Sequence, residues 1–411
     1  MCVSPHNIKA NRNTSVFLYE DLSRAEAQRR GEGIGRKERI DRKAWKRVRL
    51  GDILSYEQPY PYIVHSTEYS DTGTPVLTPG KSFILGHTPE KDGICRASIG
   101  VPKILFDDFL TISKLVQFDF KVKSSAVKIL SPTSDAYNLN FVFYAMSRLK
   151  FEVTDHQRHW IGRFSKLEIE IPMRKEQDRI AETIGSVDTC IKNIQSLIAK
   201  YEAIKKATVN LLLGKFKRRD AEAQRVKLGE VADISRGGSP RPIQDYMTSD
   251  SDGINWIKIG DVAADAKYIE KTEERIKTAG VAMSRQVKAG DFILSNSMSF
   301  GRPYILKIDG CIHDGWLAIQ NYQNTFDVNY LYYLLGSDMV FKQYIENAAG
   351  SSVKNLNKDI VAKITLPAPP LPEQRKIASQ IAAIDKVLND CKKQLDKAKN
   401  LKQGMMSYFF G

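Results

Sequence analysis

The feature that most constrains this chain is an apolar heptad pattern that occurs twice. In both copies the apolar positions are spaced alternately four and three residues apart, and each position of the second copy follows its counterpart by 197 residues. The first copy consists of Ile180, Ile184, Val187, Ile191, Ile194, Ile198 and Tyr201, and the second of Ile377, Ile381, Ile384, Leu388, Cys391, Leu395 and Ala398. Such spacing is typical of a coiled-coil seam. We therefore predict two long helices whose matching seams pair.

The duplication includes the sequences that begin and end these helices. Glu176-Gln177 precedes the first seam and Glu373-Gln374 the second, while Leu213-Gly214 and Phe410-Gly411 follow them at the same offset. Glutamate in a first turn interacts favourably with a helix N-terminus, and prolines suit a helix start. Helices this long with so narrow a seam need a partner. Antiparallel pairing within the chain is the simplest arrangement, and pairing across a dimer is the alternative.

Each predicted helix follows a globular segment, and both globular segments begin alike. Val48–Ile53 and Val226–Val231 share the pattern Val-basic-Leu-Gly-acidic-apolar, whereas the segments diverge strongly beyond it. Two unlike domains on one duplicated scaffold indicate two different targets. We divide the chain into a basic N-terminal extension (1–44), a first globular domain (45–172), a first spacer helix (173–220), a second globular domain (221–367) and a second spacer helix (368–411).

Short strands are predicted inside both globular domains. Ile254–Ile259 and Asp291–Leu294 are apolar runs beside glycine, as is typical of strands. Two aromatic segments, Asn140–Tyr144 and Asn329–Tyr333, are expected to supply helix core positions. The predicted fold class is mixed α+β: two globular domains with short strands, separated by two long antiparallel coiled-coil helices, with pseudo-twofold symmetry.

The chain is strongly basic. Its net charge is +14, from 62 basic and 48 acidic residues, which predicts a polyanionic partner and most simply nucleic acid. Charge alone leaves DNA, RNA and an acidic protein surface open. Eight of the fourteen residues from Arg36 to Arg49 are Arg or Lys. This extension is either a solvated basic arm or a segment that contacts phosphates directly.

Composition argues against several other classes of protein. The chain has no apolar run of 18 or more residues and no secretory signal at its start, so we expect a cytoplasmic protein that does not cross a membrane. Its five cysteines are scattered without a C-x-x-C pair, which argues against a metal site. His156 and His159 are expected to be surface polar residues and not metal ligands.

No catalytic constellation is recognised in the sequence. Thr78–Ser82 resembles the end of a phosphate-binding loop, but Pro75 holds the place of the upstream glycine. The chain has no Asn-Pro-Pro-aromatic or Asp-Pro-Pro-aromatic tetrapeptide of the kind that amino-methylating enzymes use. We therefore expect a binding and scaffolding protein that is not an enzyme, with no metal and no cofactor of its own.

At the entry to the second helix the sequence resembles a known family. Leu366-Pro367 through Pro370-Leu371-Pro372-Glu373-Gln374, followed by the heptads, is similar to the conserved region of type I restriction–modification specificity subunits. Residues 171–177 are its shorter counterpart, without the proline run. Gly237–Pro240, Trp256–Asp261 and Gly290–Ser295 resemble that family's target-recognition domain. The resemblance spans roughly Trp45 to Gly411 and includes the order domain–helix–domain–helix.

The resemblance implies a function. A specificity subunit is not catalytic; each of its two target-recognition domains reads one half of a split double-stranded DNA sequence. The paired helices set the spacer between the halves and dock two modification subunits. Those partners bind S-adenosylmethionine and methylate adenine, and restriction subunits added to the complex use ATP and Mg²⁺.

Candidate DNA-binding residues are polar side chains in or beside predicted turns, because base edges in the major groove are read by Arg, Lys, Asn, Gln and Ser. In the second domain they are Ser239, Arg241, Lys258, Ser295, Ser297, Arg302, Lys354 and Asn355. In the first domain they are Tyr60, Tyr62, Lys81, Ser82, Arg96 and Lys103.

Two other functions remain open from the sequence. One is a specificity segment of a self-contained restriction or modification enzyme, which catalysis by the purified chain would reveal. The other is a coiled-coil adaptor without a nucleic-acid role. A DNA reader should lose affinity steeply with salt, with log K falling by ~0.9 per neutralised phosphate per decade of salt. A flat salt response would favour the adaptor.

Overall fold

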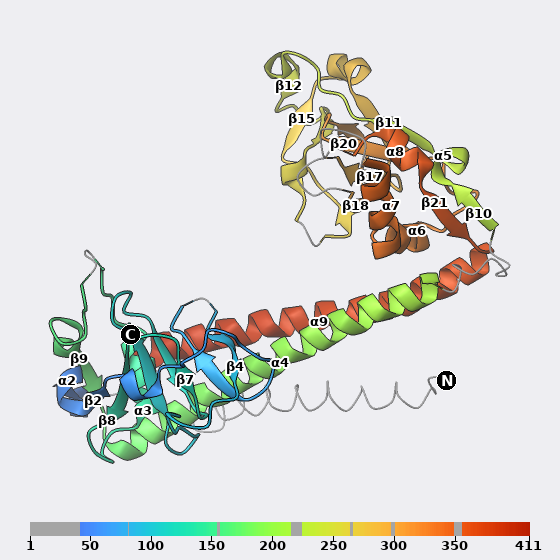
Figure 1. The fold of residues 1–411 in the computed structure, drawn as a ribbon. Helices are drawn as coiled ribbons and strands as arrows, with labels where there is room; N and C mark the ends of the chain where they lie inside the picture. Colours follow the sequence, from blue (N-terminus) through green and yellow to red (C-terminus); the bar gives the residue numbers. More distant parts are fainter. Residues whose placement is uncertain are drawn as a thin grey trace. The chain divides into compact units, whose positions relative to one another are not determined.

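The structure, a computed structural model, describes residues 42–80, 82–153, 157–214, 224–263, 266–296, 301–348 and 356–411. Contacts divide the chain into two units, which Figure 1 shows together with their secondary structure. Unit 1 comprises Met1–Ser196 and Lys392–Gly411, and unit 2 comprises Leu197–Cys391. Each long helix therefore contributes one part to each unit.

Both predicted long helices are present. Helix α4 runs over Arg174–Gly214, which is 41 residues, and helix α9 over Leu371–Phe410, which is 40 residues. Glu176 and Glu373 lie in the first turns, where a carboxylate interacts favourably with the unpaired backbone N–H groups. The proline-rich segment that precedes α9 continues to Pro372, the second residue of the helix, so this stiff segment leads directly into the helix.

The two helices pack against each other inside each unit. In unit 1, Ile180 and Ile184 near the start of α4 share a core with Phe409 near the end of α9. In unit 2, Leu213 at the end of α4 shares a core with Ile377 near the start of α9. Because the start of one helix meets the end of the other in both cases, the packed segments run antiparallel.

The seam positions face this packing. Ten of the fourteen predicted seam residues are buried. The other four, Ile191, Ile198, Ile384 and Leu395, are half-buried.

Each unit is built around an antiparallel sheet of four strands in the same order. In unit 1 the order is β2 (Leu54–Glu57), β8 (Val127–Pro132), β5 (Lys103–Asp107) and β6 (Ser113–Val116). In unit 2 it is β11 (Asp233–Arg236), β20 (Trp316–Gln320), β17 (Phe292–Ser295) and β18 (Pro303–Leu306). Unit 2 adds a fifth strand, β14 (Tyr268–Ile269), parallel to β18.

The strand registers allow residues of the two sheets to be matched. In unit 1, Ile104 on β5 lies opposite both Leu130 on β8 and Leu115 on β6. In unit 2, Phe292 holds the same place between Ile319 and Ile305. Leu115 of unit 1 therefore corresponds to Ile305 of unit 2.

A second sheet also has a common centre in both units. Unit 1 has β4 (Ile84–Thr88), β3 (Thr74–Leu77) and β7 (Lys121–Val122), with β3 antiparallel to β4 and parallel to β7. In unit 2, β15 (Glu274–Ile276), β13 (Ile254–Ile257) and β19 (Gly310–Ile312) repeat this arrangement. Strands β12 (Met247–Thr248) and β16 (Arg285–Val287) extend it on either side.

Further elements connect the sheets to the long helices. Strands β1 (Lys46–Arg49) and β9 (Glu168–Ile171) pair in unit 1, and β10 (Gln224–Lys227) and β21 (Thr365–Ala368) pair in unit 2. The aromatic segments form helices, as predicted: α3 (Leu139–Met146) and α6 (Val328–Leu335). Among the described residues, the other α-helices are α2 (Leu50–Ile53), α5 (Leu228–Val231), α7 (Asp338–Ala348) and α8 (Lys358–Lys363). Short 3-10 helices cover Arg42–Ala44, Tyr60–Tyr62, Phe164–Lys166, Ile243–Tyr246, Ile259–Asp261 and Thr278–Met283.

One expectation about the histidines is wrong. His159 is a core residue and not a surface residue: it is only 1% exposed, and its ring packs edge-on against Phe151. The reason is a backbone bond from His159 N to Asp108 O, 2.8 Å long, which draws this segment under β5. His156 lies outside the described residues. Within the described ranges, no helix combines the length and the apolar character needed to cross a membrane.

Candidate nucleic-acid interface

Asp314 organises the candidate residues of unit 2. It follows β19, and its carboxylate Oδ1 accepts a 2.8 Å hydrogen bond from Ser239 Oγ while Oδ2 lies 3.8 Å from the guanidinium of Arg241. Its main-chain oxygen accepts bonds from Arg236 Nε at 3.1 Å and from Asn296 Nδ2 at 2.8 Å. The loops that follow β11, β17 and β19 therefore meet at one residue.

The electrostatics of this cluster favour an ionised Asp314. The hydrogen bond from Ser239, more than the nearby charge of Arg241, holds the pKa of this carboxyl below its usual value. Arg241 remains largely exposed, with 81% of its side-chain surface accessible. An oriented yet accessible guanidinium is suited to a negatively charged or hydrogen-bonding ligand.

The backbone of the loop after β11 packs closely against the backbone on either side of Asp314, which brings this loop to Asp314. Gly237 N donates to Trp316 O at 2.9 Å, and Gly238 N donates to Ile312 O at 3.1 Å. A Cβ at Gly237 would overlap the carbonyl oxygen of His313, so only glycine permits this approach.

His313 ties the β13 loop to the same cluster. The backbone N–H of Ile259 donates to His313 Nε2 at 3.2 Å. Burial lowers the pKa of His313, which keeps its ring neutral and able to accept this bond. Lys258, one residue before, donates to Glu274 Oε1 at 2.5 Å, and that bond raises the pKa of the lysine.

Ser295 and Arg302 are placed at the base of the loop that follows β17. Ser295 is 1% exposed, and its Oγ accepts a 3.3 Å bond from the backbone N–H of Arg302. The Ser295 side chain therefore holds the backbone of the loop and does not face solvent. Sequence reasoning missed Arg236, Asn296 and Asp314, and of these only Asn296 lies next to the end of a strand that it predicted.

The candidates of unit 1 bond three different partners. Tyr62 donates its hydroxyl to Glu57 Oε1 at 2.7 Å, and this bond raises the pKa of Tyr62 to about 12. Arg96 forms an ion pair with Asp119 and stays 74% exposed. In addition, Lys103 Nζ donates to Ser131 Oγ at 2.7 Å, and Tyr60 and Ser82 are exposed. Four candidates, Lys81, Ser297, Lys354 and Asn355, lie outside the described residues.

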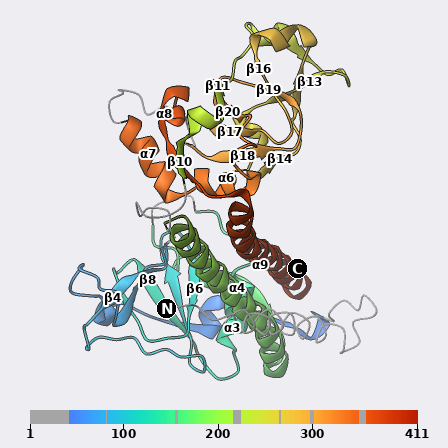
Figure 2. The ribbon, with the colours of Figure 1, turned by 90° about the vertical axis from the view of Figure 1, so that its right-hand side faces the viewer.

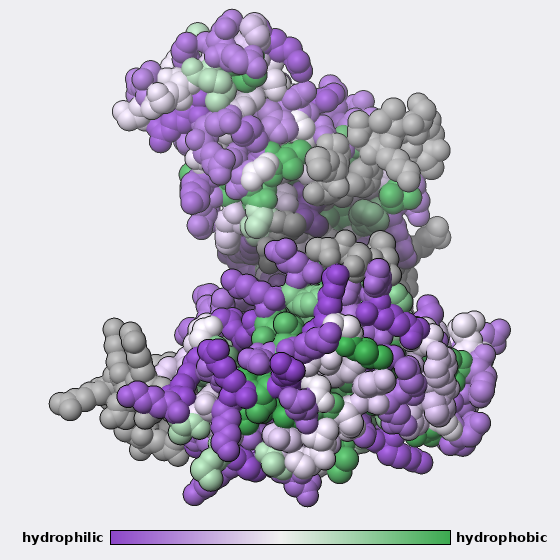
Figure 3. Space-filling view, turned by 90° about the vertical axis from the view of Figure 1, so that its left-hand side faces the viewer, coloured by the Kyte–Doolittle hydropathy of each residue, from purple (hydrophilic) through white to green (hydrophobic). Residues whose placement is uncertain are grey.

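One face of the protein is mainly polar. The face in Figure 3 is dominated by hydrophilic residues, with apolar residues in small separate patches. Within the described ranges, no group of three or more His, Cys, Asp or Glu is arranged to hold a metal ion. This surface suits a charged macromolecular ligand better than an apolar one.

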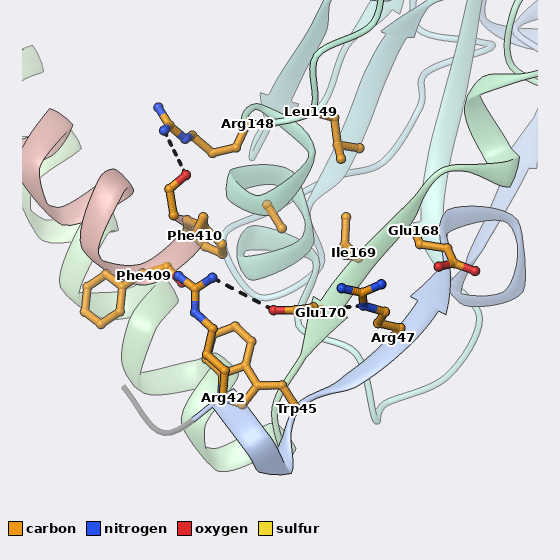
Figure 4. Close-up of a pocket in the computed structure, with 12 residues that line it drawn as sticks. Arg42, Trp45, Arg47, Arg148, Leu149, Glu168, Ile169, Glu170, Phe409 and Phe410 are labelled. Carbon is orange, nitrogen blue, oxygen red and sulfur yellow. Dashed lines mark hydrogen bonds and ion pairs between the residues drawn. The ribbon is translucent and has the colours of Figure 1, made fainter. Parts of the chain in front are cut away.

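A cavity of about 290 Å³ in unit 1 surrounds the end of α9 (Figure 4). Arg42 donates to the main-chain oxygen of Phe409 at 3.0 Å, and Arg148 donates to that of Gly411 at 3.2 Å. These cations satisfy carbonyl groups that the last turn of a helix leaves unpaired, at the end where positive charge is favourable. Because both arginines already hold the helix end, we assign this cavity to the anchoring of α9.

A buried glutamine joins the aromatic helix to the long helix in each unit. In unit 1, Gln177 Oε1 accepts from Asn138 N at 2.8 Å, and its Nε2 donates to the main-chain oxygens of Ala136 and Pro172 at 3.1 and 2.9 Å. In unit 2, Gln374 makes the same three bonds, each 2.8 Å long, with Asp327 N, Thr325 O and Pro369 O. The repeated Glu-Gln pair of the sequence is thus a structural connection.

A tyrosine, an aspartate and a lysine form a second repeated connection. In unit 1, Asp188 on α4 accepts from the Tyr144 hydroxyl at 2.9 Å and pairs with Lys402 Nζ of α9 at 2.6 Å. In unit 2, Asp385 on α9 accepts from the Tyr333 hydroxyl at 2.7 Å and pairs with Lys205 Nζ of α4 at 2.6 Å. Both the aspartates and the lysines are 197 positions apart, so the spacing was visible in the sequence although the contact was not.

Comparison with known proteins identifies the family. The family model described as type I restriction modification DNA specificity domain matches residues 42–203 and 221–399. The type I restriction enzyme EcoR124I/EcoR124II specificity subunit of Escherichia coli is 29% identical over 375 residues, covering 88% of this chain and 91% of that protein. The type I restriction enzyme MjaVIII specificity subunit of Methanocaldococcus jannaschii is 22% identical over 415 residues, with the same coverages of 88% and 91%.

A solved structure shows the same fold. The crystal structure of a type I restriction–modification S subunit from M. genitalium matches with a TM-score of 0.63 at 15% identity, covering 92% of this chain and 98% of that chain. This agrees with the mixed helix and strand fold predicted from the sequence. The chain therefore belongs to the family of type I restriction–modification specificity subunits, which are non-catalytic and carry two recognition domains.

Proposed function

We propose that each unit reads one half of a split double-stranded DNA sequence. The chain would act in the cytoplasm and dock two modification subunits and, through them, restriction subunits. The chemistry would belong to these partners, which use S-adenosylmethionine, ATP and Mg²⁺. The family, the duplicated scaffold and the net charge of +14 support this proposal.

The observation that carries the proposal is the cluster around Asp314. It gathers Arg236 and Arg241, and arginine is a residue type that recognises base edges by pairing with guanine. Asp314 also orients these side chains before DNA binds, which lowers the conformational entropy lost on binding. Other basic residues would contact phosphates and set the register.

Bivalency supplies the reason for the duplication. When one unit is bound, the other experiences a high effective concentration of DNA, but only if the second half-site lies at the distance that the connecting helices allow. The spacing between half-sites would then be part of the recognised sequence. Adenine methylation requires that the base leave the helix stack, which suits a modification subunit held beside a reading domain.

Methylation mapping tests the proposal directly. The full chain is co-expressed with its modification subunit, and methylated adenines are located across the genome. We expect one split motif with a constant gap, and we expect Arg241→Ala to relax one half of that motif while the other half is kept. A continuous motif, or relaxation of both halves by this one change, would contradict the proposal.

A further inference from the structure

Unit 2 holds one of its own lysines in a cradle of aromatic rings. Lys267 Nζ donates to Asn329 Oδ1 at 2.7 Å and lies 4.8 and 5.1 Å from the ring centres of Tyr332 and Tyr333 on α6. The ring of Tyr268, the next residue, is 5.3 Å away. An ammonium group is attracted to the faces of aromatic rings, and it also needs a hydrogen-bond acceptor when it leaves water. We call Asn329, Tyr332 and Tyr333 the filled cradle.

Unit 1 has the same cradle without the lysine. The residues of α3 that correspond are Asn140, Phe143 and Tyr144. Phe143 and Tyr144 have ring centres 5.6 Å apart at 59°, and Tyr332 and Tyr333 have ring centres 5.3 Å apart at 70°. The two aromatic pairs therefore present similar faces. We call Asn140, Phe143 and Tyr144 the empty cradle.

Asn140 has a hydrogen-bond acceptor without a donor, at the position that corresponds to the Asn329 oxygen in unit 2. Its side-chain oxygen Oδ1 is buried and has no hydrogen-bond partner among the described residues, whereas Asn329 Oδ1 accepts from Lys267. A buried oxygen without a donor costs free energy, so such groups are normally paired. A donor supplied by a ligand would remove that cost.

The sheet edge beside the empty cradle is also uncovered. In unit 2 the lysine arrives on β14, which pairs in parallel with β18 next to α6 (Figure 2). In unit 1 the strand that corresponds to β18 is β6, and among the described residues β6 pairs with β5 alone. Ser113, Lys114 and Leu115 of β6 are half-exposed. An exposed edge offers unpaired backbone groups to an added strand.

We propose that unit 1 binds an extended, lysine-bearing segment of another polypeptide along β6, with the lysine ammonium in the empty cradle. The segment runs parallel to β6, as β14 runs to β18. Its backbone completes the sheet, and its lysine donates to Asn140 Oδ1 between the faces of Phe143 and Tyr144. Addition of a strand to a sheet edge is an established mode of peptide binding, in which side-chain pockets supply specificity.

The registers also specify the residues that follow the lysine. Tyr268 lies opposite Ile305, whose counterpart in unit 1 is Leu115, and Ile269 lies opposite Leu306. The bound segment therefore has an aromatic or apolar residue directly after its lysine. A water molecule would satisfy Asn140 Oδ1 only, and it would leave the Phe143 ring and the β6 edge without a ligand. The Tyr144 ring lies 5.6 Å from Lys402 Nζ, as the Tyr333 ring lies 5.8 Å from Lys205 Nζ in addition to Lys267, so the lysine missing from unit 1 is the counterpart of Lys267.

A peptide of this chain's own sequence is a suitable probe. The hexapeptide of residues 266–271, Ala-Lys-Tyr-Ile-Glu-Lys, carries the lysine and the two residues after it. Fluorescence anisotropy measures the affinity of the labelled peptide for the full chain. We expect saturable binding that weakens about tenfold when the first lysine is replaced by norleucine, since a charged hydrogen bond and a cation–π contact are lost.

Two protein variants locate the binding site. Asn140→Leu should weaken peptide binding about tenfold, whereas Asn329→Leu, the matched change in the filled cradle, should leave it unchanged. A photocrosslinker in place of Ile269 of the peptide should label Leu115 or Val116. The norleucine comparison uses unchanged protein, so it tests the proposal even if Asn140→Leu fails to fold.

Several results would overturn the proposal. They are absence of binding at millimolar peptide, equal affinity of the lysine and norleucine peptides, and crosslinks outside β6. A photocrosslinker placed at Lys114 of the full chain tests a different occupant. Crosslinks from Lys114 to residues 1–41 of the same chain would mean that the site is filled from within, and no other polypeptide would be needed.

Discussion

Units 1 and 2 are alike where they join the long helices and differ at their sheet edges. Gln177 and Gln374 make the same three hydrogen bonds, and both units contain the Tyr–Asp–Lys contact. By contrast, unit 2 adds β14 to one sheet and β12 and β16 to the other. Duplication has therefore kept the connection to the scaffold, while the surfaces available for binding have diverged.

The interior also differs at matched positions. Lys128 of unit 1 pairs with Asp108 at 3.4 Å, and both side chains are 1% exposed. By strand register, Leu317 takes the place of Lys128 in unit 2, and Asn296 follows β17 where Asp108 follows β5. A buried ion pair in one unit thus replaces a leucine and an asparagine in the other.

The largest effect is expected from breaking that ion pair. Lys128→Leu leaves the Asp108 carboxylate buried without its cation, so unit 1 should lose about 3–5 kcal/mol of unfolding free energy. Hydrogen exchange measured by mass spectrometry assigns the loss to unit 1. Lys128→Leu with Asp108→Asn copies unit 2 and should recover most of the stability. Equal losses in the single and double variants would show that the two interiors are not interchangeable.

The next effect concerns the shared glutamines. Gln177→Leu leaves one buried N–H and two carbonyl groups unpaired, and Gln374→Leu does the same in unit 2, so each change should cost about 2–4 kcal/mol in its own unit. Urea unfolding of both variants, followed by hydrogen exchange, checks whether the losses match. If one change were neutral, the two connections would not be equivalent.

A smaller effect is expected in DNA recognition. Arg241→Ala should reduce discrimination at one half-site by about 1–3 kcal/mol, the value of one lost bidentate contact. Arg96→Ala in unit 1 should act on the other half-site alone. Binding to DNA with single-base changes, compared with random DNA, provides the measurement. A uniform loss on all sequences would assign the arginine to phosphate contacts instead.

The smallest effect is a pH dependence confined to unit 2. Burial lowers the pKa of His313, so the unfolded chain binds a proton at a higher pH than the folded chain. The stabilising contribution is present above about pH 6.5, the ordinary histidine pKa, and is lost as the pH falls through the window below it, by at most ~1.4 kcal/mol per pH unit. By strand register, the residue of unit 1 that corresponds to His313 is Lys123.

Unfolding measured between pH 7 and pH 5 tests this difference. Unit 2 should become less stable over that range. The slope of its unfolding free energy against pH should be steeper than that of unit 1, and His313→Gln should remove this difference. An unchanged slope in the variant would place the titrating group elsewhere.

Much of the architecture could be predicted from local sequence. The bounds of α4, the strands near Ile254 and Phe292, and the helical aromatic segments follow from spacing, glycine and proline. The candidate site was predicted only in part. Ser239 and Arg241 were named from the turn that carries them, but Asp314, which joins them, lies more than seventy residues away in the chain. A turn motif does not report such a distant partner.

The duplicated scaffold with unlike domains could be recognised without a structure, because helix periodicity and a constant repeat offset can both be read directly from the order of residues. The folded chain was needed to show which loops meet, that His159 is buried, and that Lys267 enters a cradle left empty in unit 1. Those outcomes depend on strand order and on the desolvation of polar groups. Both arise from contacts between residues far apart in the chain, which a local sequence pattern does not predict.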